Sequence, residues 1–181
     1  HCEPRYEEYL ALDREVGDEG LPMVFAGDVP FHALAMTLAG YGDVFYLLND
    51  HTAQVEELLQ VMEQVERERL WPILVDSPAV LIRHGHNLSS QMTPPPLFRR
   101  YILPYYRDLA PMLHDRGKKL AYHADNDAKQ ILGLIQEAGY DGTPIVLMQS
   151  TDIASLSNMA PVAKSLMEKA GLKVDLLAMD W

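Results

Sequence analysis

The chain has 181 residues, of which 48% are hydrophobic and 23% charged, with a net charge of −11. This is ordinary globular usage, and the length allows one good core but is short for two complete domains. The acidic balance excludes a nucleic-acid surface, because phosphate binding needs clustered Lys and Arg, whereas these residues are scattered here.

The sequence also addresses compartment and chain ends. No apolar run approaches the roughly 20 residues of a membrane span. The single cysteine, Cys2, cannot form an intramolecular disulfide, which fits a reducing compartment or a disulfide-free periplasmic protein. We expect a cytoplasmic protein. The chain starts at His1 without a signal-peptide pattern and stops at Trp181 directly after a predicted strand, so we expect a fragment.

The first half of the chain predicts three helices and one strand. Apolar residues at three- and four-residue steps predict helices over residues 4–16 and 52–70, and an apolar segment predicts another over 31–39. Residues 21–26 are a strand candidate. The charged residues of the long third helix, Glu66 among them, are expected to form a solvated outer face.

The second half repeats the order strand, polar loop, helix. Residues 79–83 predict a buried strand that leads into a polar loop. Residues 97–113 predict a helix that two internal prolines should kink or split. A second strand is predicted at 118–122, and a helix over 131–138 that Gly139 ends. This repeating order favours a parallel sheet with crossover helices.

The tail predicts one further unit. Residues 144–148 and 173–178 are strand candidates, with a helix over 155–170 between them. This βαβ unit either extends the first sheet or belongs to another domain. We expect four strand centres to be neighbours in one sheet: Val24, Leu81, Leu120 and Val146.

Four segments carry a resemblance to a known family. They are residues 85–94 (GHNLSSQMTP), 98–106 (FRRYILPYY), 117–123 (GKKLAYH) and 132–141 (LGLIQEAGYD). In their order and spacing, residues from about 20 to 140 resemble the uroporphyrinogen decarboxylase superfamily, which includes cobalamin-dependent methyltransferases that activate a thiol.

The resemblance implies a fold, a function and partners. The expected fold class is α/β, a partial (β/α)8 TIM barrel of parallel strands over residues 1–140, followed by a βαβ segment over 141–181. The implied activity is that of a lyase that decarboxylates a tetrapyrrole in porphyrin metabolism, or of a methyltransferase working with a corrinoid. The implied partners are a tetrapyrrole or methyl donor and, for methyl transfer, a corrinoid protein.

The chain lacks residues that each of the two activities uses in this family. The decarboxylases carry an N-terminal arginine-rich motif and an early aspartate that holds the pyrrole NH groups, and neither is recognised here. The methyltransferases bind zinc through a His-x-Cys pair and a later Cys. Here His123 is kept, but Asp125 takes the place of the thiolate, and Cys2 is remote in sequence. Zinc and a corrinoid therefore both remain open as cofactors.

The tail resembles a second family. Residues 138–145 (AGYDGTPI), 170–174 (AGLKV) and 179–181 (MDW) are similar to extracellular solute-binding proteins of peptide and nickel ABC transporters. The implied alternative is a transport receptor, or a non-functional hybrid of the two families. In that case we expect the tail to form a small separate lobe with partly uncovered apolar residues, cleaved early by a protease near 141–143.

Candidate site residues follow the predicted strands. His123, Asp125 and His86 are the candidate catalytic residues, and His123 is also the candidate metal ligand. Asn87 and Asn126 are the candidate cofactor-binding residues. The alternative is purely structural: a histidine fixed by a carbonyl, an aspartate capping a helix and an asparagine holding a turn.

Of the two histidines after the strand at 79–83, His86 is the better candidate, because it lies further along the loop than His84. We expect His86 and His123 to converge in one cleft. Tyr105, Tyr106 and Trp71 are expected to pack in the core rather than to contact a cofactor.

Overall fold

The computed structural model describes residues 3–85, 88–123, 127–139, 145–150, 159–169 and 174–179. The chain divides into two compact units, His1–Tyr140 and Asp141–Trp181, and each is described by itself. The described elements of the first unit are α1 (Glu7–Val16), β1 (Met23–Phe25), α2 (Pro30–Ala33), α3 (Tyr41–Asp50), α4 (Thr52–Arg69), α5 (Trp71–Asp76), β2 (Leu81–Arg83), α6 (Pro95–Leu97), α7 (Leu103–His114), β3 (Lys119–Ala121) and α8 (Leu132–Glu137).

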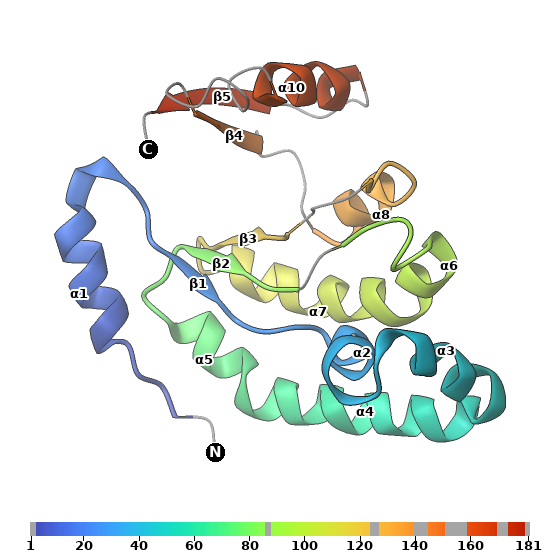
Figure 1. The fold of residues 1–181 in the computed structure, drawn as a ribbon. Helices are drawn as coiled ribbons and strands as arrows, with labels where there is room; N and C mark the ends of the chain where they lie inside the picture. The colour runs from blue at the N-terminus through green and yellow to red at the C-terminus, as the bar shows by residue number, and fades with distance from the viewer. Residues whose placement is uncertain are drawn as a thin grey trace. The chain divides into compact units, whose positions relative to one another are not determined.

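The strands of the first unit form an open parallel sheet in the order β1-β2-β3 (Figure 1). In this register Val24 lies beside Ile82, and Ile82 beside Leu120. The predicted neighbours near Val24, Leu81 and Leu120 are therefore confirmed. The result is a parallel α/β arrangement, mostly helical, and closure into a barrel is not seen in the described strands.

The two faces of this sheet differ sharply in how deeply their side chains are buried. Side chains alternate along a strand, so Val24, Ile82 and Leu120 share one face, which packs into the helical core; Ile82 is fully buried. On the opposite face lie Phe25, 52% exposed, and Arg83 beside it. The arginine at the end of β2 therefore projects to the open face of the sheet.

Helix α7 supplies much of the core under the sheet. It packs against β3, α5 and α8, and its residues Tyr105, Tyr106, Leu109 and Leu113 are 0–1% exposed. The predicted break in this helix is present as a wide π-helical turn at Phe98–Ile102. That turn ends just before Pro104, whose missing N–H cannot continue the regular ladder, while Pro111 remains inside α7.

Two short helices were not predicted from the sequence. Helix α3 contains Gly42 in its first turn, and the glycines at 40 and 42 were interpreted as the end of the helix before it. Helix α2 continues as a π-helical turn over Leu34–Leu38, and Gly40, with φ +93°, follows its end, but Gly42 is helical. Helix α5 follows α4 almost directly, with Pro72 in its first turn, where a missing N–H costs nothing.

The second unit is a βαβ unit made of β4 (Ile145–Ser150), α10 (Met159–Lys169) and β5 (Val174–Met179). Its two strands pair in parallel with each other, with Val146 opposite Asp175. The prediction that the strand at Val146 belongs to the first sheet is therefore wrong. Two six-residue strands joined by a crossover helix satisfy each other's backbone hydrogen bonds locally.

Helix α10 carries an apolar stripe at three- and four-residue spacing. Met159, Val162 and Leu166 are 61%, 59% and 62% exposed. Val174 of β5, in contrast, is only 4% exposed, so incomplete cover is not general to the apolar residues of the tail. How far the first unit covers the tail stays a prediction.

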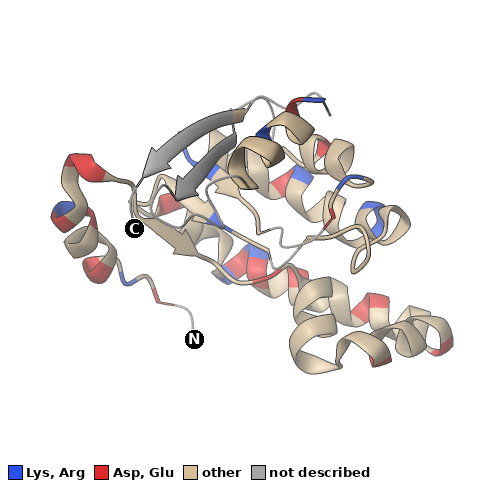
Figure 2. Ribbon diagram, turned by 45° about the horizontal axis from the view of Figure 1, so that its top comes forward, with Lys and Arg blue, Asp and Glu red and all other residues tan. Residues whose placement is uncertain are grey.

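Acidic side chains are distributed over several helices, including α1 and α4 (Figure 2). Within the described residues, no helix is long and apolar enough to cross a membrane.

Candidate functional site

Polar side chains follow each strand of the first sheet at its carboxyl end. Asp28 comes shortly after β1, His84 directly after β2, and His123 shortly after β3. Because the strands are parallel, these three positions lie along one edge of the sheet. Parallel α/β proteins place their ligands and chemistry at this edge.

Arg83 and His123 form a contact across this edge. Nη2 of Arg83 lies 3.3 Å from Nδ1 of His123, and its guanidinium carbon lies 4.6 Å above the ring of Phe25. A guanidinium can only donate, so Nδ1 of His123 accepts, and a neutral imidazole then carries its proton on Nε2. Nε of Arg83 is buried and has no hydrogen-bond partner among the described residues.

His84 lies in a fully buried polar cluster beneath the edge. The hydroxyl of Tyr106 donates to the His84 carbonyl at 2.9 Å and lies 3.1 Å from Nδ1 of the same residue. The hydroxyl of Tyr105 lies 3.4 Å from Nε2. Burial, with a smaller contribution from His32, lowers the pKa of His84 to about 4. The imidazole is therefore neutral near pH 7.

Glu66 extends this cluster towards α4. Tyr105 donates to Oε2 of Glu66 at 2.5 Å, and Nε1 of Trp71 donates to the Tyr105 hydroxyl at 2.8 Å. Burial raises the pKa of Glu66 to about 7, and the charges of Glu63 and Asp28 add to the rise, while the Tyr105 hydrogen bond opposes it. The prediction of a solvated outer face is thus wrong for Glu66, because α7 packs beside α4 and brings a tyrosine hydroxyl to it.

A second buried contact ties α2 to the loop after β2. Nε2 of His32 lies 2.8 Å from Oγ1 of Thr93, and both residues are buried. On the same loop the backbone N–H of Leu88 donates to the His123 carbonyl at 2.8 Å. The loops after β2 and β3 are therefore held together at the site edge.

The predicted site residues are only partly within the described structure. His123 lies at the carboxyl end of β3, where it was expected. His86, Asn87, Asp125 and Asn126 lie outside the described residues, so the convergence of His86 with His123 stays a prediction. His84, placed second to His86 in the sequence, makes the buried contacts described above.

Three participating residues were missed in the sequence. Arg83 could have been recognised from the sequence, because an arginine at the end of an otherwise apolar strand needs a partner or solvent for its charge at the sheet edge. Glu66 could not, since it sits among other charged residues of α4. Tyr105 was correctly expected to be buried, but its hydrogen bonds depend on tertiary packing.

The described residues do not fit a zinc ion. Across the described ranges, no three side chains of His, Cys, Asp or Glu are gathered as a metal would require. Nδ1 of His123 is already an acceptor from a cation, which leaves the proton on Nε2, the nitrogen a metal would need. Asp125, which takes the place of the family's thiolate, and Cys2 lie outside the described residues.

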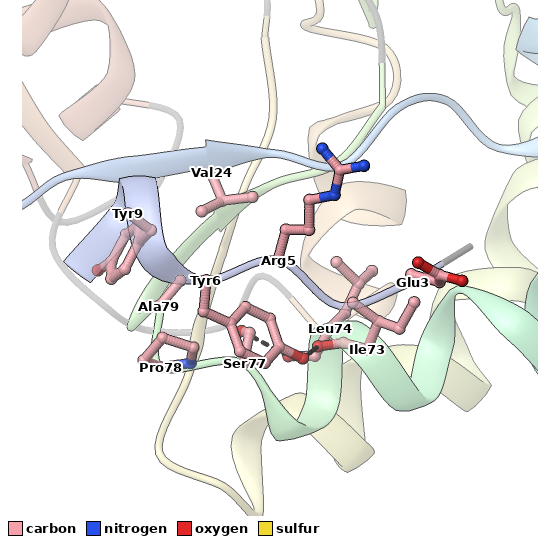
Figure 3. Close-up of a pocket in the computed structure, with 10 residues that line it drawn as sticks. All are labelled: Glu3, Arg5, Tyr6, Tyr9, Val24, Ile73, Leu74, Ser77, Pro78 and Ala79. Atoms are coloured by element: carbon pink, nitrogen blue, oxygen red, sulfur yellow. Dashed lines mark hydrogen bonds between the residues drawn. The ribbon is translucent and has the colours of Figure 1, made fainter. Parts of the chain in front are cut away.

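A cavity of about 240 Å³ lies elsewhere in the first unit (Figure 3). It is lined by Glu3, Arg5, Tyr6, Tyr9, Val24, Ile73, Leu74, Ser77, Pro78 and Ala79. Ser77, Pro78 and Ala79 directly precede β2, so this cavity opens near the amino ends of the strands. It is separate from the edge at which Arg83 and His123 meet.

The first unit is an α/β unit whose open parallel sheet carries a guanidinium and two imidazoles at its carboxyl edge, where parallel α/β proteins bind small molecules. The family model of uroporphyrinogen decarboxylase (URO-D) matches residues 8–168. The chain belongs to this family. The comparisons with curated proteins and with solved structures found no match.

The family match also bears on the tail. It runs through the boundary at about 137–142 that the second resemblance implied. Nothing in the comparisons supports a solute-binding origin for residues 141–181.

Proposed function

We propose that this chain binds a carboxylated tetrapyrrole at the carboxyl edge of its first sheet and takes part in its decarboxylation. The observation that carries the proposal is Arg83. Its guanidinium is held at the sheet edge between Phe25 and His123, with a buried Nε that has no acceptor among the described residues.

The surroundings of Arg83 suit an amphiphilic anion. Met23 and Phe25, on the same face of the sheet, are about half exposed (48% and 52%) and offer an apolar surface to a ring system. Arg83 offers a planar donor pair that matches a carboxylate. A tetrapyrrole polycarboxylate combines both properties, and local cations are needed because the chain itself carries a net charge of −11.

The reaction sets two requirements. The bond between the substrate carbon and its carboxylate breaks, CO2 leaves, and the electron pair stays on carbon until a proton arrives. Arg83 supports the first step by holding a carboxylate, and Nε2–H of His123 can donate a hydrogen bond to a second one. His86 and Asp125, the predicted catalytic residues on the adjoining loops, are the proposed sources of the proton.

Anaerobic turnover of uroporphyrinogen tests the proposal. We expect loss of carboxyl groups from the substrate, read by chromatography of the oxidised products. Arg83→Met should weaken binding about tenfold to a hundredfold, which is the effect of losing one charge-assisted hydrogen bond of about 1.5–3 kcal/mol.

Arg99→Met is the matched control, because Arg99 is 62% exposed and pairs only loosely with Glu137 at 3.7 Å. Equal binding by wild type and Arg83→Met would overturn the assignment of Arg83. Absence of decarboxylation, together with loss of methylcobalamin absorbance in the presence of a thiol, would instead select corrinoid methyl transfer, the family's other activity.

A further inference from the structure

We propose that Glu66 is a positioning residue that sets the tautomer of His84 through the hydroxyl of Tyr105. The three side chains form a continuous path from α4 to the carboxyl end of β2, with contacts of 2.5 Å and 3.4 Å. The inference goes beyond the proposed function and does not depend on it.

The hydrogen-bonded path has two protonation states. In the first, Glu66 is ionised, and the position of each proton follows from which groups can donate. A carboxylate only accepts, so the single proton of Tyr105 points to Glu66. The oxygen of Tyr105 accepts from Nε1 of Trp71, which can only donate, and has room for one more donor. His84 must supply that donor as Nε2–H. Its Nδ1 is then bare and accepts from the hydroxyl of Tyr106, whose single proton turns from the His84 carbonyl to Nδ1 in this state.

The second state follows when Glu66 takes up a proton. Its new O–H donates to the oxygen of Tyr105, which then accepts from both Glu66 and Trp71. The proton of Tyr105 turns to Nε2 of His84, so Nε2 must be bare and Nδ1 must carry the proton. Nδ1–H then donates to Tyr106, whose own proton goes to the His84 carbonyl.

The two states differ by one proton, which is added at Glu66. The imidazole stays neutral in both, as its complete burial requires, and every donor has an acceptor in each state. The His84 carbonyl accepts from Tyr106 only in the second state. Ring stacking of His84 on Tyr105, with centroids 5.4 Å apart, keeps the imidazole in place while its proton changes sides.

Charged and titratable groups face Glu66 from each neighbouring element. Burial raises the pKa of Glu66 to about 7, which puts the switch near neutral pH. The guanidinium of Arg67 is held by Glu63 and by Asp108 of α7, which limits its effect on Glu66. The facing groups are Glu63 and Arg67 of α4, Tyr105 of α7, Asp28 after β1 and His84 after β2.

NMR of the intact chain with 15N-labelled histidine tests the inference. The bare and the protonated ring nitrogen of a neutral imidazole have well-separated 15N shifts. From about pH 9 to about pH 5 the bare nitrogen of His84 should change from Nδ1 to Nε2, with a midpoint near the Glu66 pKa of about 7. This readout needs no substitution in the core.

Three variants sharpen the test. Glu66→Gln cannot titrate and should hold His84 in one tautomer at every pH. Tyr105→Phe should leave the carboxyl titration in place but uncouple it from His84. Glu63→Gln is the matched control: it removes a nearby charge from the same helix, so the switch should persist with its midpoint at lower pH. A single tautomer across the range in the wild type, or a switch that survives Tyr105→Phe, would overturn the proposal.

Discussion

The hydroxyl oxygen of Tyr106 lies 2.5 Å from the position that a Cβ on Gly85 would occupy. Gly85 also has φ +96°, a backbone conformation that residues with a Cβ rarely adopt. The turn after β2 is therefore fixed by two independent constraints, the backbone and the tyrosine.

Gly85→Ala should lose more stability than Gly27→Ala, and the pair separates the two constraints. Gly27 has φ +85° but nothing within 4 Å of its Cβ position. We expect Gly27→Ala to cost about 1–2 kcal/mol from strain alone, and Gly85→Ala about 1–3 kcal/mol more from the clash. Chemical denaturation measures both values.

Tyr106→Phe provides the control. Removing the hydroxyl should relieve the clash but not the strain, so the double variant should lose less than the sum of the two single variants. Equal losses for the two glycine variants would show that the Tyr106 contact does not constrain the turn.

The strands and the site edge were largely predictable from sequence, for a local reason. β1, β2 and β3 are short apolar runs between helical segments, and a parallel order of such runs places their carboxyl ends together. This placed His123 at the edge. The cluster beneath the edge was not predictable, because the partner of Glu66 depends on how α7 packs against its neighbours.

The pairing of the tail strands shows a second limit of prediction from sequence. Periodicity gave both strands and the helix of the βαβ unit within a few residues, yet the partner of the strand at Val146 was wrong. An apolar run carries little information on which edge it joins. A nearby strand of equal length and parallel direction provides the same hydrogen bonds at a shorter chain separation.

Lys118→Met should destabilise the first unit by about 1.5–3 kcal/mol, which is typical for a charged hydrogen-bond donor. Lys118 is 6% exposed, and its Nζ donates to the carbonyls of Ser77 and Ala79, the latter at 2.9 Å. Without it, two inward carbonyls before β2 lose their donor. Lys119→Met, at an exposed neighbouring position, is the control and should cost little. Similar losses for both variants would show that the buried contacts contribute nothing.

The wild type should lose stability as the pH rises, because Glu66 ionises in a buried place. Glu66→Gln should abolish this loss. The pKa of Glu66 is raised to about 7 in the folded chain from an ordinary 4.5, so its contribution is fully present below pH 4.5 and is lost as the pH rises through 7. Solvent screening of a half-buried carboxyl reduces the effect to about 1–2 kcal/mol. Urea titrations at a series of pH values measure it. A wild-type and variant difference that is constant with pH would contradict this account.

His84 should make stability depend on pH in the opposite direction, and His84→Asn should remove this contribution. The pKa of His84 is lowered to about 4 from 6.5, so its contribution to stability is present above pH 6.5 and is lost as the pH falls towards 4, by up to about 3 kcal/mol. Between pH 5 and about 6.5 the Glu66 and His84 dependences have opposite signs and offset each other in the wild type.

Each single variant should therefore show the pH dependence of stability that the other group causes. Glu66→Gln should lose stability towards pH 5, because only the His84 term remains, and His84→Asn should gain stability over the same interval, because only the Glu66 term remains. Comparing slopes with pH, not absolute stabilities, separates this effect from the packing cost of changing a buried residue. Parallel curves for the wild type and both variants would show that neither group titrates as its burial requires.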